Sequence, residues 1–218
     1  MNLQLALDRM TKEECFRMLA ETEESIDWIE VGTGVIKEYG MAIVREIKQA
    51  YPEKIIVADM KTCDAGKHEA AQAFRSGADI TTVMAFSADQ TIRDTLKVAD
   101  ESGGRVMIDL LGITDSKRIE ELSQLGVDLV SLHFGKDMQE SGEMKEEDLF
   151  SLIKEHSGLE VAVAGGINSG SLPRVLREGP DTIIVGSAIT KQKDSSQSAQ
   201  SMKGVMNEYE NNRRYSQQ

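Results

Sequence analysis

Two carboxylates and one ammonium group lie in a single short segment of this chain, residues 59–64. Asp59, Lys61 and Asp64 directly follow an apolar run at residues 55–58, which predicts a buried strand. In proteins built on parallel strands, the carboxyl ends of the strands carry the chemistry. We therefore interpret this segment as part of a catalytic site; a purely structural ion network is the alternative.

Three further acidic residues, Asp8, Glu30 and Asp109, also follow predicted strands. If the strand ends meet, these carboxylates share one cleft with a single lysine, and they cannot all remain there unpaired. A hard divalent cation such as Mg²⁺ resolves this, because carboxylate oxygens are its preferred ligands. Glu30 and Asp59 follow adjacent strands, and we predict that they bind Mg²⁺. Pairing of either residue with Lys61 or with a helix N-terminus is the alternative.

His133 is the one histidine at a predicted strand end. Its ordinary pKa near neutrality suits proton transfer, so we predict a catalytic role for it. His68 and His156 fall in predicted helices and are expected on the surface.

Two glycine-containing turns follow the last two predicted strands: Gly165-Gly166 and Gly186-Ser187. In proteins whose parallel strands close into a barrel, the loops after the seventh and eighth strands often bind phosphate through their backbone N–H groups. Glycine in such a loop allows the anion to come close to the backbone. The position of the pairs predicts a phosphate site.

Short apolar runs alternate with longer amphipathic segments along the chain, which is typical of repeated β-α units. Strands are predicted at residues 3–7, 28–31, 55–58, 80–84, 105–110, 129–132, 161–163 and 182–185. Helices are predicted from the capping-box pattern at Thr11 and Glu14, and at residues 34–50, 64–76, 89–102, 116–125, 145–156, 171–178 and 195–209.

Eight strands, each followed by a helix, predict a (β/α)8 TIM barrel of the α/β class. We assign residues 1–210 to this single catalytic domain and residues 211–218 to a polar, frayed C-terminal tail. A doubly wound open sheet is the alternative, although no reversal point of strand order is found for it.

The net charge of −12 argues against nucleic acid as a partner, since phosphate backbones bind basic surfaces. The N-terminus has no signal-peptide pattern, and no apolar run is long enough for a membrane span, so a cytoplasmic protein is expected. Cys15 and Cys63 have neither a CxxC partner nor zinc-ligand spacing, which fits a reducing compartment. We interpret Cys63 as a small space-filling residue; a nucleophile is the alternative.

Six segments together resemble a known family: LQLALD, IEVGTGVIKEYG, ADMKTCDAG, LHFGKDMQ, AVAGGI and IIVGSAIT. The chain resembles the orotidine 5'-monophosphate decarboxylase suprafamily over residues 1–205, and within it the 3-hexulose-6-phosphate synthase branch. The D-x-K-x-x-D motif of Asp59, Lys61 and Asp64 is its most specific part.

The resemblance implies a Mg²⁺-dependent, reversible aldol reaction of formaldehyde with D-ribulose 5-phosphate, by way of an enediolate. Lys61 would donate to the developing oxyanion and His133 would carry a proton. Asp64 would hold substrate hydroxyls, orient Lys61 or reach into the site of the neighbouring subunit, so that a homodimer with shared active sites is expected. Asp8, Asp109 and Lys136 are expected to contact the phosphorylated sugar.

There are three alternatives to this function. A 3-keto-L-gulonate-6-phosphate decarboxylase would use the same metal site, but that branch typically has a glutamate where this chain has Asp109 and an arginine where it has Lys136. A phosphopentose epimerase typically has histidine ligands on early strands, and the first 60 residues contain no histidine. The alternative of a different class is a barrel that binds a sugar phosphate without converting it.

Overall fold

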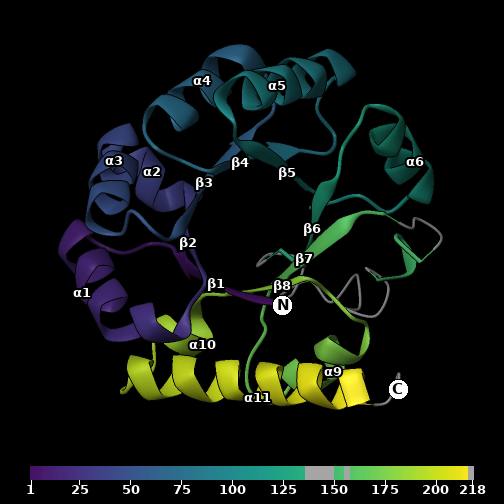
Figure 1. The fold of residues 1–218 in the computed structure, drawn as a ribbon. Helices are drawn as coiled ribbons and strands as arrows, with labels where there is room; N and C mark the ends of the chain where they lie inside the picture. The colour runs from purple at the N-terminus through teal and green to yellow at the C-terminus, as the bar shows by residue number, and fades with distance from the viewer. Residues whose placement is uncertain (136–149, 155–157, 216–218) are drawn as a thin grey trace.

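The apolar runs form a closed ring of parallel strands, as a computed structural model shows for residues 1–135, 150–154 and 158–215 (Figure 1). The strands follow chain order around the ring, and β8 pairs with β1 to close it. Their bounds are Asn2–Leu7 (β1), Trp28–Val31 (β2), Ile55–Thr62 (β3), Ile80–Met84 (β4), Arg105–Asp109 (β5), Leu129–His133 (β6), Glu160–Ala164 (β7) and Thr182–Val185 (β8). The predicted (β/α)8 barrel is therefore confirmed, and the open sheet is excluded.

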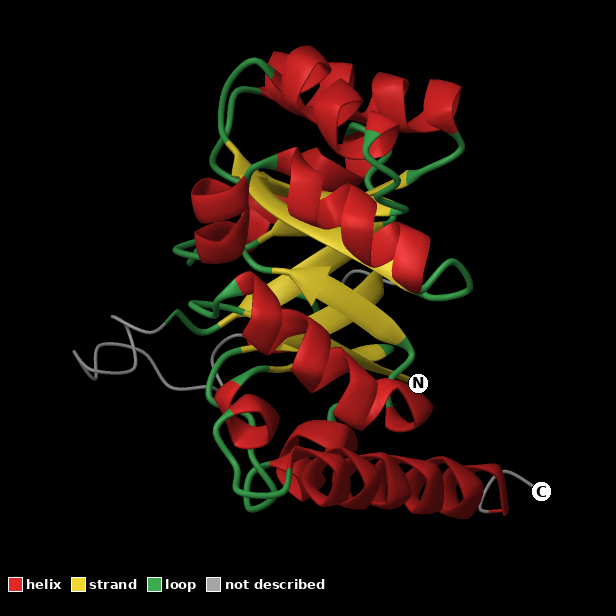
Figure 2. Cartoon of the chain, turned by 90° about the vertical axis from the view of Figure 1, so that its left-hand side faces the viewer, coloured by secondary structure: helices red, strands yellow, loops and turns green. Residues whose placement is uncertain are grey.

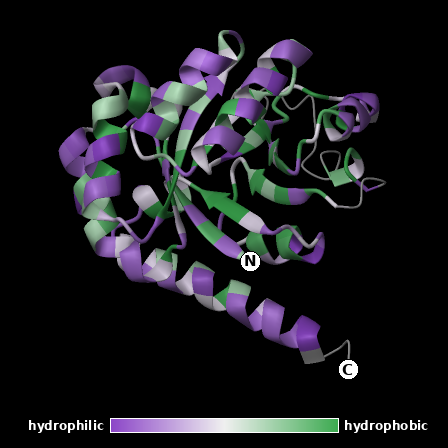
Figure 3. Ribbon diagram, turned by 45° about the horizontal axis from the view of Figure 1, so that its top comes forward, coloured by the Kyte–Doolittle hydropathy of each residue, from purple (hydrophilic) through white to green (hydrophobic). Residues whose placement is uncertain are grey.

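Helices surround the barrel on its outside (Figure 1). Their bounds are Lys12–Thr22 (α1), Thr33–Tyr39 (α2), Met41–Ala50 (α3), Gly66–Arg75 (α4), Asp89–Ser102 (α5), Ser116–Gln124 (α6), Leu172–Arg177 (α9), Ser187–Thr190 (α10) and Ser195–Tyr215 (α11), with a 3₁₀ turn at Glu23–Ser25. Hydrophobic residues concentrate on the strands and on the helix faces turned toward them (Figure 3). In the described residues, no helix is both long and apolar enough to cross a bilayer.

Two layers of apolar side chains hold the barrel together. The larger core lies between strands and helices, whereas a smaller cluster is centred on Trp28, Val57, Met107 and Ile184. Alternate residues of each strand point to opposite faces, so the smaller cluster fills the barrel interior and the next inward-facing residues lie at its carboxyl end. The carboxyl end of the barrel interior therefore rests on a layer of packed apolar side chains.

Several predicted bounds were wrong for local reasons. The helix expected over residues 34–50 is broken at Gly40, whose positive φ of 62° separates α2 from α3. Asp115 rather than Ser116 caps α6 by accepting from the Lys117 N–H. The third strand continues to Thr62, four residues beyond the prediction.

The C-terminal helix is longer than predicted. α11 extends to Tyr215 and packs across α1, α9 and α10 along one side of the barrel, so it includes most of the segment expected to be frayed (Figure 2). The capping box at Thr11 and Glu14 is present at α1. The helix predicted over residues 145–156 lies mostly outside the described residues.

Candidate active site

A cavity of about 490 Å³ opens at the carboxyl ends of the strands. Most of the residues predicted for the site line this cavity: Asp8, Glu30, Asp59, Lys61, Asp109, His133, Gly165, Gly166, Gly186 and Ser187. Residues from every strand end except that of β4 were predicted, and β4 contributes Thr82 to the lining. The closed barrel is what brings these distant positions together.

Asp109 connects the two candidate catalytic residues. Its Oδ2 lies 2.5 Å from Lys61 Nζ and 3.0 Å from His133 Nδ1, and its Oδ1 accepts from the Leu111 N–H at 2.9 Å. The residue is only 2% exposed. Burial alone would raise the pKa of Asp109, but the hydrogen bond and charge of His133 and the charge of Lys61 outweigh it and lower the pKa to about 2. Asp109 is therefore a fixed negative charge.

This charge sets the protonation of both neighbours. Burial lowers the pKa of Lys61, but the charges of Asp59 and Asp109 raise it further, so the net shift is upward and the ammonium stays charged. Burial also lowers the pKa of His133, and its hydrogen bond to Asp109 more than compensates, so this pKa is raised as well. With Nδ1 turned to Asp109, Nε2 is the ring nitrogen left for a substrate.

Lys61 is held in an uncommon backbone conformation. Its φ is 46°, in the left-handed region that costs an L-residue roughly 1–2 kcal/mol. The regular pairing of β3 with β4 is interrupted between Ala58 and Thr62, which explains how the strand accommodates it. The ammonium then lies 3.3 Å from Asp59 Oδ1 as well as beside Asp109. Two of its three donors are therefore directed at carboxylates, and one remains for a substrate.

Asp59 and Glu30 form the second part of the site. Asp59 accepts from Thr33 Oγ1 at 2.6 Å and from Thr82 Oγ1 at 2.8 Å, which orients both of its oxygens. Glu30 accepts from Gln4 Nε2 at 2.6 Å. Burial, followed by the charge of Asp59, raises the pKa of Glu30 to about 7.

These residues fit a magnesium ion. Two close carboxylates in a buried place destabilise each other unless a cation lies between them. Gln4 Oε1, next to Glu30, is moreover a buried acceptor without a hydrogen-bond partner among the described residues. The described residues contain no metal-binding group of three or more His, Cys, Asp or Glu. A bound cation would therefore take its other ligands from water and substrate, as Mg²⁺ commonly does.

The glycine turns border the opposite side of the cavity. Gly165 and Gly166 both have positive φ, of 113° and 67°. A Cβ at Gly165 would lie 2.2 Å from the carbonyl oxygen of Phe134, so this glycine is required by close packing. Gly186 and Ser187 begin the short helix α10, which directly follows β8. Glycine leaves the backbone accessible from the cavity, and a site that binds an anion through backbone N–H groups requires this.

Some predicted residues lie elsewhere. Asp64 is exposed and is not among the residues that line the cavity of its own chain. The ammonium group of Lys61 pairs with Asp59 and Asp109 instead. The expectation that Asp64 orients Lys61 was therefore wrong. Cys63 is exposed as well, which corrects its interpretation as a space-filling residue. His68 is exposed, as predicted. Lys136 and His156 lie outside the described residues.

Several lining residues were missed from the sequence, among them the polar residues Gln4, Thr33, Thr82 and Lys191. Gln4 and Thr82 interrupt apolar strands with a polar side chain at the inward-facing position, and this signal could have identified them. Thr33 and Lys191 lie beyond strand ends, where polar residues are common and carry no such signal.

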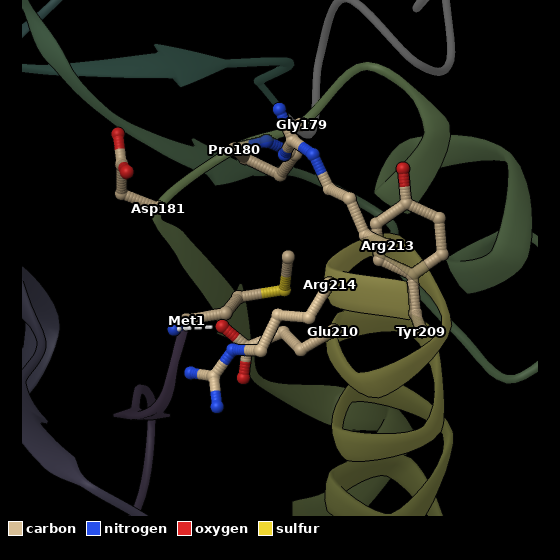
Figure 4. A pocket seen from close by; sticks show the side chains of 8 residues that line it. All are labelled: Met1, Gly179, Pro180, Asp181, Tyr209, Glu210, Arg213 and Arg214. Atoms are coloured by element: carbon tan, nitrogen blue, oxygen red, sulfur yellow. Dashed lines mark hydrogen bonds and ion pairs between the residues drawn. The ribbon is translucent and has the colours of Figure 1, made fainter. Parts of the chain in front are cut away.

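A second, smaller hollow of about 170 Å³ lies at the other end of the barrel, next to the first residue of the chain (Figure 4). The ammonium group of Met1 is paired with Glu210 at 2.7 Å. The side chains of Arg213 and Arg214 point in different directions, so they do not converge on one ligand (Figure 4). The larger cavity is therefore the candidate active site.

Comparison with known proteins agrees with this geometry. The orotidine 5'-phosphate decarboxylase / HUMPS family matches residues 1–202. The chain belongs to this family.

Within the family, several relatives share a name. A 3-hexulose-6-phosphate synthase of Bacillus subtilis (strain 168) is 37% identical over 207 residues, which cover 94% of this chain and 99% of the relative. The crystal structure of 3-hexulose-6-phosphate synthase from Salmonella typhimurium superposes with a TM-score of 0.93 at 35% identity, covering 96% of this chain and all of that chain. A crystal structure of KGPDC from Streptococcus mutans, determined as a ligand complex, has a TM-score of 0.90 at 26% identity, covering 95% and 98% of the two chains.

Proposed function

We propose that this chain is a carbon–carbon lyase that catalyses the reversible aldol condensation of formaldehyde with D-ribulose 5-phosphate to give 3-hexulose 6-phosphate. The observation that carries the proposal is the cavity itself, in which the Lys61–Asp109–His133 network faces Glu30 and Asp59. The similarity to synthases of that name over nearly the whole chain supports the choice of substrates.

The reaction requires removal of a proton next to a ketone, which leaves an enediolate. Lys61 is a charged donor that is already in place, and a preorganised donor stabilises an oxyanion without rearranging. His133 would carry the proton at Nε2, with Asp109 fixing the ring through Nδ1. The raised pKa of His133 makes its neutral imidazole ring a stronger base. At pH 7, however, a smaller fraction of the molecules then has this ring in the neutral form.

Glu30 and Asp59 would hold a Mg²⁺ ion, which when bound supplies Lewis-acid stabilisation of the substrate oxygens. Thr33 and Thr82 would keep Asp59 oriented for this role. Asp8, which lines the cavity and pairs with Arg9 at 3.2 Å, would contact substrate hydroxyls. The backbone at Gly165, Gly166, Gly186 and Ser187 would bind the phosphate.

A homodimer with shared active sites is part of the proposal. Asp64 is exposed and does not line the cavity of its own chain, as expected of a residue that serves a neighbouring site. Phe86, in the loop after the adjacent strand β4, is 62% exposed, the highest exposure of any large hydrophobic side chain in the described part of the chain. An apolar residue beside Asp64's loop favours contact with a second copy.

The competing substrate is 3-keto-L-gulonate 6-phosphate, since the chain also superposes on a KGPDC structure. An assay of the purified protein with Mg²⁺ separates the two by following loss of formaldehyde with D-ribulose 5-phosphate, and release of carbon dioxide from 3-keto-L-gulonate 6-phosphate. We expect the first reaction to dominate, and excess chelator to abolish it until Mg²⁺ is restored. Dominant carbon dioxide release would favour the decarboxylase, and binding of either sugar phosphate without turnover would favour a non-catalytic barrel.

A further inference from the structure

At the carboxyl end of the barrel, one residue of β4 lies opposite three residues of β3. The pairing of the two strands is regular up to Ala58 and resumes at Thr62, and between these points residues 59–61 lie opposite Thr82 alone. Such an irregularity takes backbone groups out of the strand ladder. Because a buried backbone N–H needs a partner, the stretch depends on groups from outside the ladder.

Thr82 supplies that partner. Its Oγ1 accepts from the Lys61 N–H at 2.9 Å and donates to Asp59 Oδ1 at 2.8 Å. Lys61 Nζ lies 3.3 Å from the same Asp59 oxygen. The hydroxyl is shielded from water, since Thr82 is 5% exposed. One side chain thus connects the strained backbone of Lys61 to the carboxylate that Lys61 also contacts.

We propose that Thr82 is a positioning residue, whose hydroxyl holds Lys61 and Asp59 in the arrangement the reaction needs. Lys61 has a positive φ that L-residues avoid, so a bond to its N–H is needed to keep it there. Without that bond the Lys61 backbone would relax and its ammonium would move. Asp59 would at the same time lose one of the two hydroxyl donors that orient it. The catalytic part of this inference rests on the proposed function.

The neighbouring residue offers a matched control. Thr81 is also a buried threonine of β4, but it belongs to the opposite face of the strand, and its hydroxyl reaches only the carbonyl oxygen of Ala58 at 3.4 Å. Replacing either residue by valine keeps the shape and removes one hydroxyl. Thr82→Ser keeps the hydroxyl and is the conservative variant.

Two measurements test the proposal: amide hydrogen exchange at Lys61, followed by NMR, and the turnover number with D-ribulose 5-phosphate and formaldehyde. In Thr82→Val we expect the Lys61 amide to exchange at least about tenfold faster and turnover to fall about tenfold, with a smaller change in KM. Thr82→Ser should stay within about threefold of the wild type in both, since it retains the donor and acceptor. Thr81→Val should lose stability without either effect.

Wild-type exchange and wild-type turnover in a folded Thr82→Val would overturn the proposal, as would equal losses in Thr81→Val. If Thr82→Val does not fold, amide hydrogen exchange in the wild-type protein still tests the proposal. A Lys61 amide that exchanges there without protection would overturn the proposal. A wild type without synthase activity would instead contradict the proposed function, and the exchange measurement would still decide whether Thr82 holds Lys61.

Discussion

Asp109 determines how the charged residues of this site behave. One of its oxygens contacts both Lys61 and His133, and its lowered pKa keeps it ionised across the neutral range. Lys61 and His133 each gain a partner that favours the protonated form. The chemistry we propose for either residue therefore depends on a third residue, which is nearly inaccessible to solvent.

Replacement of Lys61 tests whether its ammonium stabilises the enediolate. In Lys61→Ala we expect exchange of the substrate's alpha proton with deuterated water to slow by about 10²–10³-fold, since one preorganised donor is lost. Lys61→Arg should restore little, because the guanidinium is planar and larger. Lys67→Ala, at an exposed position of α4, is the control. Wild-type exchange in a folded Lys61→Ala would show that this lysine only balances charge.

The pairing of His133 with Asp109 predicts a pH dependence of stability. The folded-state pKa of His133 is raised above 6.5, so its contribution to the free energy of unfolding is fully present below that pH and is lost as pH rises through the folded-state pKa. The stability difference between wild type and His133→Gln should therefore be larger below about pH 6 than above about pH 8. Urea denaturation of the metal-free proteins measures it.

His68→Gln is the control for this series, since His68 is exposed on α4 and lies outside the cavity. A difference between wild type and His133→Gln that grows with rising pH would contradict the assigned ion pair.

The ends of different strands present different kinds of groups to the cavity. β3 continues past its regular pairing and carries Asp59 and Lys61 on its inward face. The chain after β7, in contrast, turns at once through two glycines with positive φ. The first set presents charged side chains, whereas the second presents backbone. A substrate with a reactive carbonyl at one end and a phosphate at the other matches this division.

Gly166 provides the test of the phosphate side. Gly166→Ala places a methyl group on the backbone that we expect to contact the anion, and substrate affinity should fall about tenfold. Gly103→Ala is a matched control, because its φ of 68° nearly equals the 67° of Gly166 and nothing lies within 4 Å of the added Cβ. Isothermal titration with D-ribulose 5-phosphate gives the affinities, and equal losses in both variants would move the phosphate site elsewhere.

At the scale of the whole molecule, the proposed function assigns part of each active site to a second copy of the chain. The cavity contains Lys61 and Asp59 but not Asp64, the last member of the same motif. The exposed Phe86 lies in the loop after β4, beside the loop that carries Asp64. Both observations favour a dimer in which each copy contributes a residue to the active site of the other.

Mixing two inactive variants tests this arrangement. In a dimer of Lys61→Ala with Asp64→Ala, one site combines the intact Lys61 of one chain with the intact Asp64 of the other, so activity should return. Random pairing restores at most about a quarter of the sites. Recovery after the two proteins are unfolded together and refolded would support shared sites. If Asp64 acts in its own chain or not at all, the mixture will show no gain over the separate variants.

The barrel and the carboxylates that line its cavity could be predicted from the sequence. Apolar runs at regular spacing require buried parallel strands, and once eight strands close, their carboxyl ends must meet; Glu30, Asp59, Lys61, Asp109 and His133 were found in this way. Which charges pair could not be predicted, since residues far apart in the chain, such as Lys61 and Asp109, become neighbours only through strand order and register. The role proposed for Thr82 also depends on the tertiary structure, because the need for its hydroxyl arises from an irregular pairing of two strands, which no local pattern of residues predicts.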